Sequence, residues 1–208
     1  MRTLLFICLS MVVSSTALAN QDPVNTLNQL LSDPQAKQLA YDEGHARSAF
    51  CRHCHGEDGN SKRTHIPNLA EQNPIYLFNA FEKFADGQRY DFVMSKLAKS
   101  LTLDDRVNIA LYYGEQKVIT KPAAQAYVRE QGQVRFEKVC QNCHGEQGEG
   151  KQDMPRLAGQ PADYITQTLT NFRNKDPKRQ ASVMTGITAS MSDEDIHAVA
   201  HYIQELEL

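Results

Sequence analysis

The chain has 208 residues, of which 22 are Lys or Arg and 25 are Asp or Glu, so its formal net charge is −3. A nucleic-acid-binding protein is expected to carry a basic stripe, and this near-balance argues against that function. The chain has no tryptophan and a mean hydropathy of −0.51, which predicts a thin apolar core. Small domains with thin cores need a further source of stability, such as a metal, a disulfide or a bound group.

Residues 1–19 have the pattern of a secretory signal peptide. Arg2 gives a positive start, residues 4–13 form a short apolar run, and Ala17-Leu18-Ala19 supplies a small-x-small cleavage site. The apolar run is too short to span a bilayer, so an uncleaved membrane anchor is the weaker alternative. We therefore expect cleavage after Ala19 and export to the periplasm, with four of the five cysteines left in the mature chain.

The four remaining cysteines lie in a motif that occurs twice. Cys51-Arg52-His53-Cys54-His55-Gly56 returns as Cys140-Gln141-Asn142-Cys143-His144-Gly145, and a second glycine follows three residues later in each copy. Two cysteines three apart with an adjacent histidine form the attachment sequence for a c-type haem. Because residues i and i+3 share one helical face, both sulfurs can form thioethers to one porphyrin while the histidine binds its iron. The sequence thus predicts covalent attachment at Cys51, Cys54, Cys140 and Cys143, with His55 and His144 as proximal iron ligands.

Other uses of the cysteines remain open at this point: two disulfides, a thioredoxin-like redox pair, or a four-cysteine zinc site. A thioredoxin motif does not require the adjacent histidine, and a zinc ribbon does not explain the methionines described below. His197 and His201 have the spacing of metal ligands, but they share a helix face with acidic residues, which is typical of a solvated surface. No triad, phosphate-binding glycine loop or acid pair stands out, and we predict no catalytic residue.

The order of the predicted elements indicates an all-α fold. Residues 21–40 have leucines at loosely helical spacing with Pro23 and Pro34 as breaks, which predicts a short N-terminal helical extension. Residues 41–54 predict a helix that runs into the first motif. Further helices are expected over 73–85 and 162–174. Capping boxes, Thr102-x-x-Asp105 and Ser192-x-x-Asp195, begin a final helix in each copy.

The repeated order of motif, polar loop, helix, methionine and final helix predicts an internal duplication. We expect two tandem cytochrome c-type haem domains, the first over residues 20–118 and the second over residues 119–208. The stretch 117–124, which contains Pro122, is interpreted as the linker between them.

Two methionines are the predicted second protein ligands of the two haem irons. Met94 and Met184 occupy equivalent places after their histidines, in segments expected to be loops, whereas the other two mature methionines align with aliphatic residues and are interpreted as packing. A thioether ligand favours ferrous iron and leaves no open position for a substrate. The carbonyl groups of Pro67 and Pro155 are expected to accept the other N–H of each proximal imidazole and so to orient it.

Four basic residues precede Met184, namely Arg173, Lys175, Lys178 and Arg179. The ordinary explanation of such a run is solvation. The alternative hypothesis is that these charges rim the second haem and steer an acidic redox partner.

From about Tyr41 onward the sequence resembles the di-haem cytochromes c of the c4 family. The resemblance rests on both Cys-x-x-Cys-His-Gly-x-x-Gly motifs, on residues 155–160, 183–186 and 191–196, and on the Ala-x-x-Tyr-Ile helix that follows. It implies two covalently bound haem c groups in small helical domains related by a pseudo-two-fold axis. It also implies a periplasmic carrier that delivers electrons to a terminal oxidase. The first copy departs from the pattern, since Glu71 stands where the second has Gly159.

We therefore expect an electron carrier and not an enzyme, with an electron donor complex and a terminal oxidase as redox partners. Loose association with the outer face of the inner membrane is expected as well. Two rivals remain. A catalytic di-haem enzyme, such as a peroxidase or a thiosulfate dehydrogenase, would need an open iron. A cytochrome subunit of a dehydrogenase, such as a flavoprotein that oxidises sulfide, would be bound to a flavin-containing chain.

Overall fold

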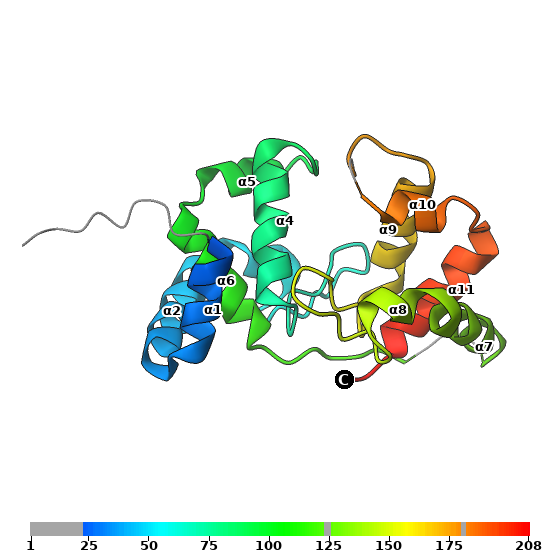
Figure 1. The fold of residues 1–208 in the computed structure, drawn as a ribbon, viewed down its shortest axis with the longest axis horizontal. Helices are drawn as coiled ribbons and strands as arrows, with labels where there is room; N and C mark the ends of the chain where they lie inside the picture. Colours follow the sequence, from blue (N-terminus) through cyan, green and yellow to red (C-terminus); the bar gives the residue numbers. More distant parts are fainter. Residues whose placement is uncertain (1–22, 123–125, 180–181) are drawn as a thin grey trace, which may run out of the picture.

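The computed structural model describes residues 23–122, 126–179 and 182–208, and the signal peptide predicted for residues 1–19 lies outside them. Within these segments the chain forms helices and turns, with no β-strand beyond two isolated bridge pairs. The prediction of an all-α fold is therefore confirmed. Figure 1 shows two groups of helices joined by an extended segment that includes residues 117–122. None of the described helices is long and apolar enough to cross a membrane.

The first group of helices, called unit 1 below, contains residues 23–114. Its elements are α1 (Pro23–Ser32), α2 (Pro34–Arg47), the 3₁₀ turn η1 (Ser48–Phe50), α3 (Arg52–His55), α4 (Pro74–Asp86), α5 (Met94–Ser100) and α6 (Leu103–Gly114). Pro34 begins a helix, because proline is tolerated in the first helical turn. The Asp33 carboxylate caps this helix by accepting the N–H groups of Gln35 and Ala36 at 2.9 and 3.2 Å.

The second group of helices, called unit 2, contains residues 126–205. Its elements are α7 (Ala126–Arg135), the π-helical turn η2 (Phe136–Cys140), α8 (Gln141–His144), α9 (Ala162–Arg173), α10 (Met184–Thr188) and α11 (Asp193–Glu205). From α7 onward the elements follow the order of α2 to α6, and α1 has no counterpart among them. This is the order expected of a duplicated cytochrome c-type domain, while the boundary between residues 118 and 119 stays a prediction.

Two local predictions were wrong. The helix expected over residues 41–54 is interrupted, because α2 ends at Arg47 and η1 separates it from α3. Met94 and Met184, expected in loops, are each the first residue of a short helix. The Asp91 carboxylate accepts the N–H of Met94 at 2.9 Å, and the Ser182 hydroxyl accepts that of Met184 at 3.2 Å. A polar side chain thus supports the start of each helix.

Each unit buries its own hydrophobic core. The core of unit 1 is formed mainly by α4 and α6 and includes Leu77, Phe78, Phe81, Phe84, Val107, Ile109 and Tyr113. The core of unit 2 is formed mainly by η2, α9 and α11 and includes Phe136, Ile165, Leu169, Ile196, Val199 and Ile203. Both final helices begin with the predicted capping boxes, with Thr102 and Ser192 as N-caps.

A glycine in each unit allows two helices to cross at close contact. A Cβ atom at Gly44 of α2 would lie 2.1 Å from the carbonyl oxygen of Asn108 in α6. One at Gly132 of α7 would lie 2.1 Å from the carbonyl oxygen of Ala198 in α11. Since no side chain fits in that space, glycine is required at both crossings. The helix before each cysteine motif is thereby held against the last helix of its unit.

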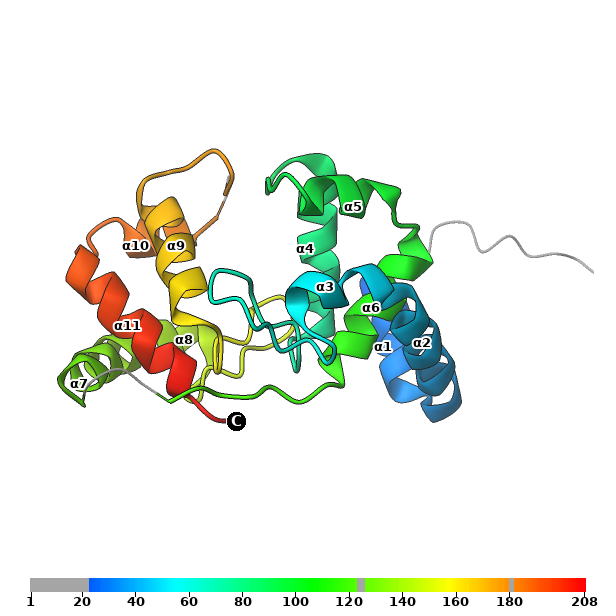
Figure 2. The same cartoon turned by 180° about the vertical axis from the view of Figure 1, so that it is seen from behind.

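The polar loops that follow α3 and α8 lie side by side between the units, as Figures 1 and 2 both show. We call this contact the seam and define it by residues 56–73 and 145–161. The Asn73 side chain donates to the carbonyl oxygen of Met154 at 2.9 Å. Beside the seam, the backbone N–H of Tyr164 in α9 donates to the carbonyl oxygen of Thr64 at 3.0 Å. The loops that carry the end of each cysteine motif therefore also join the units.

Candidate haem sites

Both cysteine motifs end in the same backbone geometry. The short helices α3 and α8 stop at Gly56, with φ 88° and ψ 159°, and at Gly145, with φ 83° and ψ 160°. A positive φ of this size favours glycine, and a Cβ atom at Gly56 would lie 2.1 Å from the carbonyl oxygen of Asn60. The glycine after each motif histidine thus turns the chain into the polar loop that follows the motif.

The two motif histidines are buried and oriented in the same way. Nδ1 of His55 lies 2.9 Å from the carbonyl oxygen of Pro67, and Nδ1 of His144 lies 2.9 Å from that of Pro155. A carbonyl oxygen only accepts, so Nδ1 is the donor and Nε2 of the neutral ring keeps its lone pair for a metal. Burial lowers the pKa of both imidazoles although the proline carbonyls act to raise it. Both rings are therefore neutral at pH 7.

Within the described residues, no disulfide joins the cysteines of either motif. Burial raises the pKa of Cys51, and it raises that of Cys140 to about 11. A reactive redox cysteine has the opposite shift, toward thiolate at neutral pH. No group of three or more His, Cys, Asp or Glu side chains in the described segments could hold a metal ion, a zinc ion included.

The candidate sulfur ligands lie on the core of their own unit. Cys51 and Met94 both pack against the core of unit 1, and Cys140 and Met184 pack against the core of unit 2. The Asp91 carboxylate, which supports the start of α5 at Met94, also acts electrostatically on His55. These contacts bring the beginning of α5 to the same region of unit 1 as His55.

Each unit thus presents the donor set that a c-type haem uses. The set contains two thiols one helical turn apart, a neutral imidazole whose Nδ1 is already bonded, and a methionine on the same core. The other histidines of unit 1 are not placed in this way, since His45, His53 and His65 are exposed. The residues present fit one haem in each unit.

The contacts of the seam were not predicted from the sequence. The Gln72 side chain donates to the carbonyl oxygen of Arg156 at 2.9 Å and accepts the N–H of Arg156 at 2.7 Å. In the reciprocal contact, the Gln160 side chain donates to the carbonyl oxygen of Asn68 at 2.7 Å and accepts the N–H of Asn68 at 3.0 Å. All four residues are buried. The sequence signal that could have indicated these contacts is the repeat itself, since Leu-Ala-x-Gln occurs at the same place in both copies.

The Arg156 guanidinium also belongs to the seam. It donates to the carbonyl oxygen of Ala70 at 2.8 Å and to that of Ala158, and its residue is fully buried. Burial lowers the pKa of Arg156 to about 10. The guanidinium stays charged at pH 7 and is held by carbonyl groups of both units. Arg156 therefore links the loop that follows His144 to the loop that follows His55.

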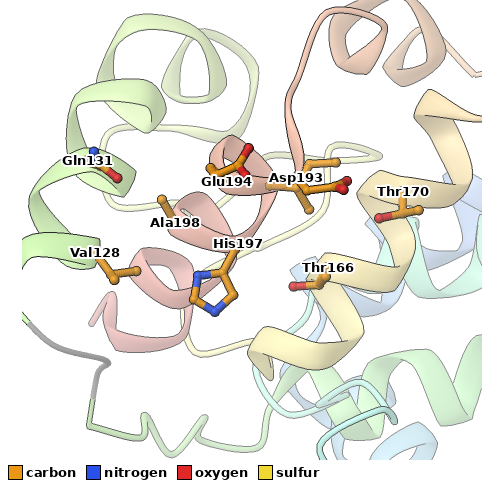
Figure 3. A pocket seen from close by; sticks show the side chains of 9 residues that line it. Val128, Gln131, Thr166, Thr170, Asp193, Glu194, His197 and Ala198 are labelled. Atoms are coloured by element: carbon orange, nitrogen blue, oxygen red, sulfur yellow. The ribbon is translucent and has the colours of Figure 1, made fainter.

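One pocket lies apart from both motifs. It has a volume of about 570 Å³ and is lined by α7, α9 and α11, with the His197 ring between Val128 and Thr166 (Figure 3). None of the motif cysteines or histidines lines it. The ring centroids of His197 and His201 are 4.4 Å apart, but the described residues around them complete no metal site. The histidine pair therefore does not compete with the motifs as a metal centre.

Known proteins match this chain over most of its length. The model of the cytochrome c family matches residues 129–207. Cytochrome c4 of Pseudomonas aeruginosa is 34% identical over 175 residues, which cover 78% of this chain and 87% of that protein. The crystal structure of reduced recombinant cytochrome c4 from Pseudomonas stutzeri matches with a TM-score of 0.75 and 30% identity, covering 80% of this chain and 98% of that one.

A relative whose name states a different role is nearly as similar. The thiosulfate dehydrogenase electron acceptor of Thiomonas intermedia is 33% identical over 171 residues, which cover 75% of this chain and 78% of that protein. The two matches to cytochrome c4 cover most of both chains, and they agree with the duplicated motifs and the order of helices described above. The chain therefore belongs to the cytochrome c4 family and is a di-haem electron-transfer cytochrome with two covalently bound c-type haems.

Proposed function

We propose that in each unit the two cysteines and the histidine of the motif, together with one methionine, hold one haem. The attachment and ligand residues are Cys51, Cys54, His55 and Met94 in unit 1, and Cys140, Cys143, His144 and Met184 in unit 2. The observation that carries this proposal is the pair of histidine-to-proline contacts, which have the same atoms and the same length of 2.9 Å in both units. A contact kept in both copies supports one role for both histidines.

The residues of each site are suited to moving an electron and nothing else. The bound haem supplies a one-electron couple between ferric and ferrous iron. The carbonyl groups of Pro67 and Pro155 hold the imidazoles in the orientation and tautomer that direct Nε2 to a metal. A methionine thioether on the other side would close the sixth position and raise the reduction potential. If the histidine and the methionine of each unit both held the iron, no position would remain there for a substrate or a water molecule.

We further propose that the chain works in the periplasm, after cleavage behind Ala19, and passes electrons from a donor complex to a terminal oxidase. The signal-peptide pattern supports the location, and membership of the cytochrome c4 family supports the role of carrier. A terminal oxidase sits in the inner membrane. Loose association of the carrier with the outer face of that membrane is part of the same proposal.

The second candidate function is that of an acceptor for a periplasmic dehydrogenase. It is favoured by the similarity to a protein named as a thiosulfate dehydrogenase electron acceptor. Reduction rates with a purified thiosulfate dehydrogenase and oxidation rates with membranes that contain a terminal oxidase separate the two candidates. A carrier to the oxidase is reoxidised rapidly by the membranes, whereas a dedicated dehydrogenase acceptor is reduced by the enzyme much faster than it is reoxidised.

The ligand assignment is tested by replacing each candidate methionine. We expect Met94→Leu and Met184→Leu each to remove about half of the sulfur-to-iron charge-transfer absorption of the ferric holoprotein and to lower one of its two potentials. Each opened iron should then bind cyanide. Met154→Leu is the matched control, because Met154 is half-buried and lies outside both candidate positions. An unchanged visible spectrum in both ligand variants would refute the assignment.

A further inference from the structure

A helix covers one face of unit 1 that no described helix covers in unit 2. This helix is α1, which contacts α2, α4 and α6 (Figure 1). Its Leu27 side chain is fully buried, and its Leu30 side chain packs against the core of unit 1. α1 therefore closes the face of unit 1 at which α2, α4 and α6 meet.

The pocket in unit 2 lies on the equivalent face. It is lined by α7, α9 and α11, which follow the order of α2, α4 and α6 in the repeat. Residues of α2 and α4 correspond to residues 88 positions later, and residues of α6 correspond to residues 90 positions later. Three residues that line the pocket have counterparts in unit 1 by this rule, namely Val128 with Ala40, Thr166 with Phe78 and His197 with Val107.

Burial differs between the units at all three positions. The three residues of unit 1 are at most 5% exposed. In unit 2, by contrast, Val128 and Thr166 are half-buried and His197 is exposed. The pocket of about 570 Å³ is therefore the counterpart of the space that α1 fills in unit 1. Unit 1 shows that one short helix fits against such a face.

The α7 side of the pocket is apolar. Val128 lines the pocket, and Val134, one turn beyond the lining residue Gln131, is 61% exposed. Unit 1 has the smaller Ala40 and Ala46 at the positions of these two valines. Unit 2 thus presents more apolar surface on α7 than unit 1 presents on α2, on the face that lacks a covering helix.

The α11 side of the pocket is acidic. Asp193 and Glu194 both line the pocket and are exposed (Figure 3). Arg173 pairs with Asp193 at 2.7 Å, whereas Glu194 joins none of the eight ion pairs found in the described segments. Unit 1 has Leu103 in place of Asp193, and α1 contains no charged residue. A helix that complements the pocket of unit 2 is therefore expected to carry positive charge, which α1 lacks.

We propose that this pocket docks one amphipathic helix of another protein. Its apolar stripe lies against Val128 and Val134, and its Lys or Arg residues lie beside Asp193 and Glu194. In this mode of recognition, a helix places its apolar face in a groove and contacts it at every third or fourth residue. Since α1 has 10 residues, about three turns are enough to cover the face.

Two observations limit what the occupant is. The α1 helix of a second copy is not the proposed occupant, because it is uncharged and its Leu27 side chain is buried in its own unit. No cysteine or histidine of the two motifs lines the pocket. The proposal therefore does not depend on which residues hold the haems.

The test uses the holoprotein and two helix-constrained synthetic peptides. One peptide has the sequence of residues 23–32, and the other carries lysine at three exposed positions of that sequence, Asn25→Lys, Asn28→Lys and Gln29→Lys. Isothermal titration calorimetry gives both affinities. We expect the lysine peptide to bind at one site per molecule, about tenfold more tightly than the uncharged peptide. Its affinity should fall as the salt concentration rises.

Variants of the pocket locate the site. Val134→Lys should weaken binding of the lysine peptide about tenfold, because it removes an apolar contact and adds a like charge. Glu194→Gln should weaken it about threefold. Leu39→Lys is the matched control, since Leu39 is a 62% exposed residue of α2, and it should leave the affinity unchanged. The double variant Asp193→Leu with His197→Val has the residues of unit 1 at both positions and should prefer the uncharged peptide.

The gain of affinity in the double variant cannot result from misfolding, and thermal unfolding identifies any single variant that folds poorly. A lysine peptide that does not bind, or that binds wild type, Val134→Lys and Glu194→Gln equally, would overturn the proposal. A dimer of the holoprotein in analytical ultracentrifugation that Val134→Lys dissociates would also overturn it, because the face would then belong to a contact between copies of this chain.

Discussion

At residue 71 a glutamate adopts the left-handed backbone conformation that the second copy reserves for a glycine. Glu71 has φ 56° and Gly159 has φ 70°. The Glu71 carboxylate accepts the N–H of Val118 at 3.1 Å and pairs with Lys117 at 2.6 Å. Lys117 is 85% exposed, so its ion pair contributes little, and the hydrogen bond to the start of the linker is the larger gain. This departure from the family pattern therefore attaches the linker to unit 1.

We predict that at residue 71 the glutamate side chain raises the free energy of unfolding and the strained backbone conformation lowers it. Glu71→Ala removes the hydrogen bond and keeps the left-handed strain, and it should lower the free energy of unfolding by about 1 kcal/mol. Glu71→Gly removes the same bond but relieves about 1 kcal/mol of strain, so its stability should be close to that of the wild type. Denaturant unfolding measures both. Equal losses in the two variants would show that backbone strain is absent at residue 71.

The candidate attachment residues could be named from the sequence because the chemistry that they would perform depends on residues close together in the chain. Cys51 and Cys54 are one helical turn apart and His55 is adjacent, so spacing alone suggests one porphyrin. The carbonyl of Pro67 beside His55 was expected from the same stretch of chain, and the structure has this contact at 2.9 Å. The charge of Arg89 near His55 was not expected. The residues between them include the whole of α4, and the sequence does not specify the direction in which that helix runs relative to the motif.

At the scale of the helix, the capping boxes show how equivalent elements differ in strength. Asp105 of α6 accepts from the Thr102 N–H at 2.9 Å and pairs with Arg47 at 2.9 Å. The equivalent pair in unit 2, Arg135 with Asp195, is longer at 3.6 Å. Burial acts to raise the pKa of Asp105, but the hydrogen bonds of Thr102 and Arg47 outweigh it and lower that pKa. The carboxylate of Asp105 therefore stabilises the fold only while it is ionised.

We predict that Asp105→Ala lowers the free energy of unfolding by about 1 kcal/mol at pH 7. A carboxyl group with a lowered pKa in the folded state contributes above its unfolded value, near 3.8, and loses that contribution as the pH falls through the folded value. The gap between wild type and variant should therefore shrink below about pH 3.8. Thermal unfolding against pH measures it. Asp195→Ala is the matched control and should cost less at pH 7, whereas a gap that is constant with pH would contradict the role of the charge.

The limits of a helix were predicted well where the sequence pattern was amphipathic. They were predicted poorly where a single polar side chain supports the first turn of a short helix. The helices expected over 73–85 and 162–174 are α4 and α9, displaced by a residue at most. The helix expected through the first motif is interrupted by the 3₁₀ turn Ser48–Phe50, which periodicity does not distinguish from an α-helix. The helices at Met94 and Met184 were missed because single polar side chains support their first turns, a signal too short for periodicity.

At the scale of the whole molecule, two glutamines hold the units in register. The side chain of Gln72 pairs with both backbone groups of Arg156, and that of Gln160 pairs with both backbone groups of Asn68. The two contacts are related by the internal repeat, so the seam has the approximate two-fold symmetry implied by the family resemblance. Because the same loops bear the proline carbonyls, the seam also fixes one imidazole relative to the other.

We predict that Gln72→Met and Gln160→Met each lower the free energy of unfolding by about 1–3 kcal/mol, since each leaves a buried N–H and C=O unpaired. The double variant should lose less than the sum, because the first change already loosens the shared seam. Denaturant unfolding of the four proteins gives the coupling energy. Gln38→Met, at an exposed position of α2, is the control. Strict additivity would mean that the two contacts act independently and that the seam is not one unit.

The sequence by itself determined the duplication, the helical class, the attachment chemistry and the candidate ligands, because spacing and adjacency along the chain encode them. Only the tertiary structure decided how the two copies face each other. The pairing of Gln72 with Arg156 joins one copy to the other, as does the convergence of Arg89 and Arg179 on Tyr164. Neither helical periodicity nor motif spacing specifies such contacts, since they depend on the packing of two complete units.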